Sequence, residues 1–154
     1  DDVLRLGASH LNIGQPADEG HIVLADPEGN EFCVIEPDNA YLAGCGLLGE
    51  LACDGTRAVG LFWSAALGWP LVWDLGQETA IQSPAGGTKI AWGGPPLGPN
   101  HAQGHQVLEL IATDQAAQVE RLLGLGASWV DTRGATVILT DPDGAPFQVT
   151  GPPA

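Results

Sequence analysis

The stretch Asp141-Pro142-Asp143-Gly144 decides the fold, because it repeats Asp26-Pro27-Glu28-Gly29 from the other end of the chain. In each copy proline presets the backbone at the second turn position and glycine closes the turn, which predicts a hairpin between two strands. Each turn is preceded by a further repeated segment, Leu6-Gly7-Ala8-Ser9 and Leu125-Gly126-Ala127-Ser128. The chain therefore contains an internal repeat: a helix end, two strands, a turn and a last strand.

Residues 47–92 supply the elements that the first copy lacks. A strand is predicted at residues 47–53, and Asp54 or Thr56 is expected to cap the helix after it. Apolar residues at helical spacing give this helix one buried face: Val59, Phe62, Trp63, Ala66 and Leu67. Gly68 is expected to end the helix. Three short strands are predicted to follow it, at residues 71–74, 79–82 and 89–92.

The same pattern starts again after a linker at residues 93–104, which is rich in glycine and proline. Residues 106–112 alternate as a strand, and Thr113 is expected to cap a second helix. The buried face of that helix is predicted to contain Val119, Leu122 and Leu123. Three more strands then end at Thr150.

These patterns predict how the chain is divided. Residues 1–37 are expected to be the C-terminal part of an incomplete first unit, and residues 38–46 a linker. Residues 47–150 are expected to form one complete domain made of two βαβββ units. The first unit spans residues 47–92 and the second spans residues 105–150.

The helix sequence Phe62-Trp63-Ser64-Ala65-Ala66-Leu67-Gly68-Trp69 resembles the vicinal oxygen chelate (glyoxalase/bleomycin-resistance/dioxygenase) superfamily, and in it the bacterial glyoxalase-like domain. Three other segments carry the same resemblance: Glu78-Thr79-Ala80-Ile81, Gly86-Gly87-Thr88-Lys89-Ile90 and the turn region 26–33. The resemblance implies an α+β fold, in which paired βαβββ units form a cupped mixed sheet with helices outside. It also implies a small-molecule ligand, often with a divalent metal, in the cup.

The resemblance implies four metal-ligand positions, one on the first and one on the last strand of each unit. They fall at residues 47–49, at residues 90–92, near Val107 and at Gln148, and Cys33 takes the position of Gln148 in the incomplete unit. Among the positions of the complete domain, only Gln148 carries a donor side chain, whereas such a site needs several converging His, Glu or Gln donors. We therefore expect no metal and no other cofactor, with a divalent metal as the alternative.

Strand parity indicates which side chains face the cup. If Gln148 faces inward, Pro146 and Thr150 do so too, and the same test turns His105, Val107, Glu109 and Ile111 inward. Leu48, Glu50 and Ala52 share a face of the first strand. Glu50 and Glu109 are then expected to face one cavity, where they could share a metal in an unusual arrangement, bind a cationic ligand, or act as acid and base. The alternative is that both carboxylates are solvated at the rim.

Two tryptophans complete the candidate ligand-binding residues. Trp73 and Trp92 lie on short strands, where they either stack on a flat aromatic ligand or pack in the core. The full set of candidates is Glu50, Trp73, Trp92, His105, Glu109 and Gln148.

Composition excludes several classes of partner. A formal net charge of −14, with five basic residues, argues against nucleic acid and would attract a cationic ligand. No apolar run approaches the roughly 20 residues of a membrane span. Cys33, Cys45 and Cys53 have no zinc-module spacing, and the N-terminus does not read as a signal peptide, so we expect a cytoplasmic protein.

The predicted function is that of a glyoxalase-like, bleomycin-resistance-protein-like domain that binds a small cationic or aromatic molecule without a metal. One alternative is a metal-dependent lyase, isomerase or dioxygenase, and another is a scaffold domain with a vestigial cup. Because the incomplete unit leaves a strand edge unpaired, we also expect a homodimer or a chain that is part of a longer one.

Overall fold

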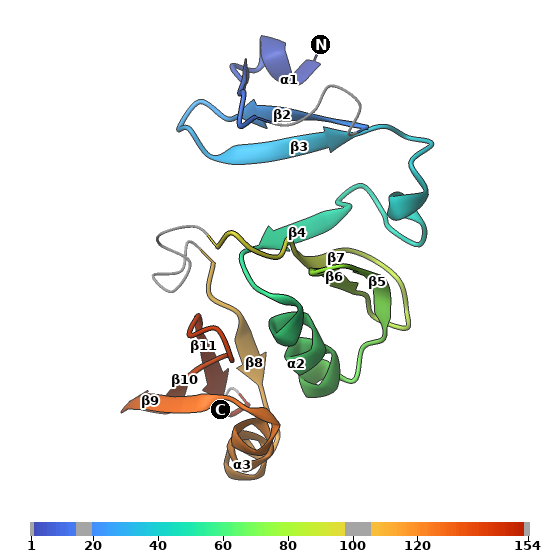
Figure 1. Cartoon of the computed structure of the whole chain (residues 1–154). Coiled ribbons are helices and arrows are strands. Elements are labelled where there is room, and N and C mark those ends of the chain that lie inside the picture. Colours follow the sequence, from blue (N-terminus) through green and yellow to red (C-terminus); the bar gives the residue numbers. More distant parts are fainter. Residues whose placement is uncertain (1, 15–19, 98–105, 153–154) are drawn as a thin grey trace. The chain divides into compact units, whose positions relative to one another are not determined.

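A computed structural model describes residues 2–14, 20–97 and 106–152 and divides the chain into two units, Asp1–Gly44 and Cys45–Ala154 (Figure 1). The described part of the first unit contains α1 (Asp2–Arg5) and three antiparallel strands in the order β1-β2-β3. These strands are β1 (Ser9–His10), β2 (His21–Ala25) and β3 (Glu31–Ile35), and a short 3-10 helix (Ala40–Leu42) follows them. The division after Gly44 falls inside the segment that the sequence assigns to a linker.

The second unit begins with one βαβββ arrangement. Its elements are β4 (Glu50–Cys53), α2 (Arg57–Leu67), β5 (Leu71–Leu75), β6 (Glu78–Ile81) and β7 (Lys89–Trp92). The strands lie in the order β4-β7-β6-β5, with β4 parallel to β7 and the other pairs antiparallel. The helix α2 packs against β5, β6 and β7.

A second βαβββ arrangement repeats this topology. Its elements are β8 (Glu109–Ile111), α3 (Gln115–Leu125), β9 (Ser128–Arg133), β10 (Thr136–Thr140) and β11 (Pro146–Thr150). The strand order is β8-β11-β10-β9, and β8 is again parallel to the last strand, β11. This is the α+β arrangement of two βαβββ units that the sequence predicts.

The two βαβββ halves share one hydrophobic core. Phe62 and Trp63 of α2 contact Phe147 of β11, with ring centroids 5.9 and 4.9 Å apart. The same cluster contains Val59 of α2 and Val149 of β11, both fully buried. Since full burial of such side chains contributes roughly 1.5–3 kcal/mol each, this core is the main link between the halves.

The helix ends correct one prediction and confirm another. The N-cap of α3 is Asp114 rather than Thr113, because the Asp114 carboxylate accepts a hydrogen bond from the N–H of Ala117 at 3.0 Å. Gly68 ends α2 as predicted, in a left-handed conformation with φ of 67°. At the start of α2, Thr56 is the N-cap, and its N–H and hydroxyl both donate to the carboxylate of Asp143, at 2.6 and 3.1 Å.

The two repeated turns hold their first aspartate in different environments. In the first turn the Asn30 side chain donates to Asp26 at 2.8 Å, and this hydrogen bond lowers the pKa of the exposed Asp26 carboxyl. In the second turn the N–H groups of Asp143 and Ala145 donate to Asp141 at 3.0 Å each. Burial nevertheless raises the pKa of Asp141, because it penalises the charged form.

Carboxyl-carbon NMR titration is therefore expected to give a pKa above 3.8 for Asp141 and below 3.8 for Asp26. A carboxyl whose pKa is raised in the folded state stabilises the fold when protonated, and that contribution is lost as pH rises through the folded pKa. The stability of the wild type relative to Asp141→Asn should therefore fall as pH rises from 3.8 through the raised pKa of Asp141. The Asp26→Asn variant is the matched control. The stability of the wild type relative to this variant should rise with pH, because the pKa of Asp26 is lowered. Equal pKa values for the two carboxyls would contradict the assignment.

Candidate functional site

Strand register sets one polar pair of side chains in each of the two βαβββ halves. Glu109 of β8 is the partner of Gln148 of β11, and Glu50 of β4 is the partner of Lys89 of β7. Both pairs join the first and last strands of a half. Partners in a ladder point to the same face of a sheet, so each half presents one such pair.

In the second half this face is half polar and half apolar. Glu109 and Ile111 are exposed on β8, and Gln148 and Thr150 are half-buried beside them on β11. The Thr150 hydroxyl donates to Oε1 of Glu109 at 3.3 Å, which orients that carboxylate. Ile138 of β10 is the partner of Gln148 and adds apolar surface. Phe147 and Val149 point the other way, into the core, as strand parity predicts.

In the first half the corresponding face carries Glu50, the buried Lys89 and Trp73. Trp73 of β5 is 38% exposed and is the partner of Ala80, which in turn is the partner of Ala91. This row lies on the face of Glu50 and Lys89, where Ala80 and Lys89 are buried and Trp73 stays partly exposed. That Trp73 contacts a ligand stays a prediction.

Trp92 does not lie on that face. It is 2% exposed and packs in the core with Val59 and Phe62, so its ring is not available to stack on a ligand. Ile90 also packs against the core. Ala91, the partner of Ala52, lies on the face of Glu50 and Lys89 and carries no donor side chain.

The remaining sequence candidates are not brought together. Glu50 and Glu109 lie in separate four-stranded sheets, and no strand pairing joins these sheets among the described residues. That the two carboxylates share one cavity therefore stays a prediction. His105 lies outside the described residues.

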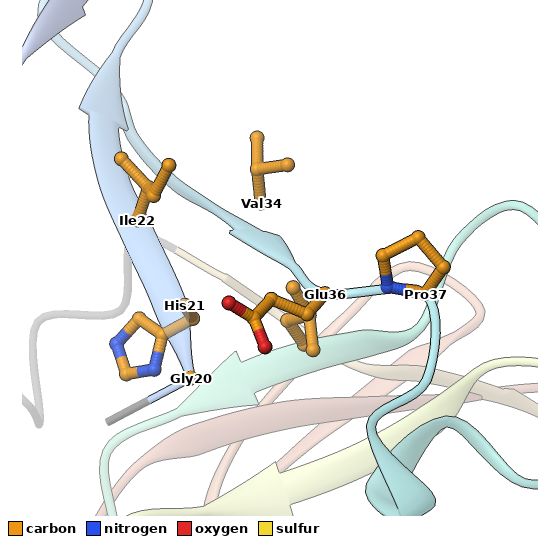
Figure 2. Close-up of a pocket in the computed structure, with 7 residues that line it drawn as sticks. Gly20, His21, Ile22, Val34, Glu36 and Pro37 are labelled. Atoms are coloured by element: carbon orange, nitrogen blue, oxygen red, sulfur yellow. The ribbon is translucent and has the colours of Figure 1, made fainter. Parts of the chain in front are cut away.

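The sequence predicts no site in the first unit, where the structure has a cavity. A cavity of about 290 Å³ lies at the end of β2 and β3, lined by Gly20, His21, Ile22, Val34, Ile35, Glu36 and Pro37. Figure 2 shows the Glu36 carboxylate directed toward the end of β2, whereas the imidazole of His21 points away from it. His21 is the ladder partner of Ile35, so these two side chains share a face of the sheet.

Cys53, on β4, is not a nucleophile at neutral pH. Burial raises the pKa of its thiol to about 12, and the nearby carboxylate of Asp54 adds to the shift. The reactive form of cysteine is the thiolate, so Cys53 stays an inert thiol, and it accordingly packs against the core.

The four side chains of these two ladder pairs do not fit a divalent metal of the type that the resemblance implies. They offer two carboxylates, one amide and one ammonium, and the ammonium of Lys89 has no lone pair and repels a cation. In the described part of the chain, no group of three or more His, Cys, Asp or Glu side chains could hold a metal ion. We therefore derive no chemistry through a metal.

Residues 1–35 and 50–150 match the family described as "Glyoxalase-like domain", and the chain belongs to this family. Comparison with curated proteins finds no match. None of the described helices has the length and apolar character needed to cross a membrane.

Solved structures share the fold. TnmS3, an antibiotic binding protein from Streptomyces sp. CB03234, is 17% identical, with a TM-score of 0.52 over 70% of this chain and 97% of that one. A member of the glyoxalase/bleomycin resistance protein/dioxygenase superfamily from Sphaerobacter thermophilus DSM 20745 is 16% identical, with a TM-score of 0.51 over 70% and 98%. At such identities the likeness concerns the fold alone, and it confirms the predicted α+β fold of this superfamily.

Proposed function

We propose that the chain binds a small aromatic cation on the sheet face around Glu109, without a metal. The observation that carries this proposal is the register of Glu109 with Gln148, which sets a carboxylate, an amide and the Thr150 hydroxyl next to one another. Ile111 and Ile138 flank these polar groups and offer apolar surface to a ring. A ligand with one ammonium and one ring would satisfy both parts of the face.

Charge favours a cation over an anion. The chain has a formal net charge of −14, which raises the local concentration of cationic ligands near an exposed carboxylate. In the second half, the described residue opposite Glu109 is neutral Gln148, whereas in the first half Glu50 faces the ammonium of Lys89. The Glu109 face is therefore the more anionic of the two.

The fold also supports a function in small-molecule binding, although it does not indicate which molecule. TnmS3, whose fold this chain shares, is described as an antibiotic binding protein. A binding role of this kind needs no catalytic donor set, which agrees with the mismatch between the side chains of the two ladder pairs and a dication.

Calorimetric titration of the full chain with metal-free bleomycin and with 1-naphthylmethylamine tests the proposal. Replacing Glu109 by glutamine should weaken binding at least about tenfold, because it removes the charge but keeps the shape. Gln148→Ala should weaken it by a smaller factor. Glu78→Gln is the matched control, because Glu78 is an exposed carboxylate on β6, and it should leave binding unchanged. Equal affinities for Glu109→Gln and Glu78→Gln would sink the proposed site.

Metal analysis of protein purified without chelator separates this function from an enzymatic one. The proposal expects no stoichiometric divalent metal. Stoichiometric Ni, Zn, Fe or Mn that is lost on replacing Glu109 or Gln148 would favour a metal-dependent lyase, isomerase or dioxygenase instead.

A further inference from the structure

A second candidate binding surface lies on the opposite side of the second half. A groove of about 360 Å³ runs between α3 and the strands β9 and β10. Val119 and Val137 are nearly buried in it, whereas Leu123 and Trp129 line it with much of their side chains exposed. Trp129 is the partner of the fully buried Leu139, so it stands on the helix side of the sheet, away from Glu109. The volume falls within the range of about 300–1,000 Å³ that is usual for ligand pockets.

The strand beside this groove, β9, is paired along one edge only within the part of the chain that the structure describes. Among the described residues β9 pairs with β10 alone, and all six of its residues are exposed. The N–H of Thr132 donates to the side chain of Asp131 at 2.7 Å, so a carboxylate, and not another strand, takes up that donor. Trp129 is 54% exposed at this edge. Exposed edge strands with apolar side chains are templates for the addition of another strand.

An unpaired edge beside an apolar groove under a helix is the arrangement that binds extended peptides by strand addition. The edge offers main-chain hydrogen bonds, and the groove receives a side chain of the peptide. Glu120 is the charged residue among those lining the groove, so the complementary partner carries a basic residue next to its apolar anchor.

We propose that β9 and this groove bind an extended basic segment of another protein, which adds a strand to β9. A large apolar side chain of that segment fills the groove between Val119 and Trp129, and a lysine or arginine lies beside Glu120. The proposal is independent of the small-molecule function, because Glu109 and Gln148 face the other side of the sheet.

A second copy of this chain fits the surface less well. Trp129 already lines its own groove, so a second β9 would bring no free side chain to fill it. Two chains that each carry a formal charge of −14 also repel one another. A basic segment can bring a free apolar side chain to the groove, and its charge is attracted rather than repelled.

NMR titration of the full chain with the acetylated and amidated pentapeptide Lys-Val-Phe-Val-Lys tests the proposal. The amide signals of residues 129–133 should shift and saturate, and affinity should fall as salt rises, because part of it is electrostatic. A peptide N-methylated at the positions that face β9 should bind at least about tenfold more weakly, since it lacks those main-chain donors.

Two surface substitutions locate the groove. Leu123→Asp should weaken pentapeptide binding at least about tenfold, because it places a charge where an apolar side chain packs. Glu120→Gln should weaken binding about threefold and reduce its salt dependence. Leu61→Asp is the matched control, since Leu61 is 41% exposed on α2 and Leu123 is 38% exposed on α3. It should leave binding unchanged.

Three results would overturn the proposal. One is the absence of saturable shifts in β9, and another is equal affinity for the N-methylated peptide, which would mean apolar contact without strand addition. The third is a dimer that buries β9 and that the peptide fails to displace, because the occupant would then be a second copy of the chain.

Discussion

Replacing Gly60 by alanine is expected to lower the free energy of unfolding by about 3 kcal/mol, at the upper end for overpacking a core. Gly60 lies in α2 directly above β6, and a Cβ added there would come within 2.0 Å of Oγ1 and 2.6 Å of Cβ of Thr79. Thr79 is almost completely buried, so it cannot move aside without displacing its neighbours. Chemical denaturation followed by circular dichroism measures the change.

Gly124→Ala is the matched control, because it makes the same change in the other helix. Gly124 lies in α3, and nothing is within 4 Å of the Cβ that alanine would add. There alanine should stabilise the protein by about 0.5–1 kcal/mol, since it restricts the unfolded chain and favours the helix. Two variants with the same sign of effect would contradict the close approach of α2 to β6.

A double-mutant cycle with Thr79→Ala tests the contact itself. This substitution removes the hydroxyl that meets the added Cβ, and that hydroxyl is buried without a hydrogen-bond partner among the described residues. The coupling energy with Gly60→Ala should be about 1 kcal/mol. Thr79→Ala should not restore the full stability of the Gly60→Ala variant, because Cβ of residue 79 stays too close to the Cβ added at residue 60.

The sequence predicts this fold well because its strongest signals are local. The repeated Asp-Pro turns, the glycine at position 68 and the limits of β7 at Lys89–Trp92 are all set by a few neighbouring residues, and the structure has them as predicted. Predictions that depend on pairing were less accurate. The strand expected at residues 106–112 is shortened to Glu109–Ile111, where its ladder with β11 runs.

The candidate sites were harder to predict because they depend on register between distant strands. Lys89 reads locally as part of an apolar strand, and only the register of β7 with β4 makes it the partner of Glu50. The spacing of α3 predicts Leu123 as buried, but α3 leaves a groove beside β9 and the side chain stays 38% exposed. Periodicity indicates a helix face, but it does not tell how far a neighbouring strand extends beneath that face.

The core that the two halves share should be the most sensitive to loss of Phe147. Phe147→Ala is expected to lower the free energy of unfolding by about 3–5 kcal/mol, a large fraction of the stability of an ordinary domain. Phe147 is 1% exposed, and its ring contacts Phe62 and Trp63 of the other half. Its removal therefore leaves a cavity that neither half can close alone. If the alanine variant does not fold, Phe147→Leu should show the same effect at about 1–2 kcal/mol.

Hydrogen exchange shows whether both βαβββ halves lose stability in the Phe147 variants. Because α2 and β11 contribute to one core, β6 in the first half and β10 in the second should lose the same amount of protection in the Phe147 variants. Leu125→Ala is the control at a partly exposed position, and it should change protection by less than about 1 kcal/mol in either half. Loss of protection confined to β8, β9, β10 and β11 would mean that the halves unfold separately. The contacts of Phe147 with α2 would then contribute little to stability, and the two βαβββ arrangements would behave as independent units rather than as one domain.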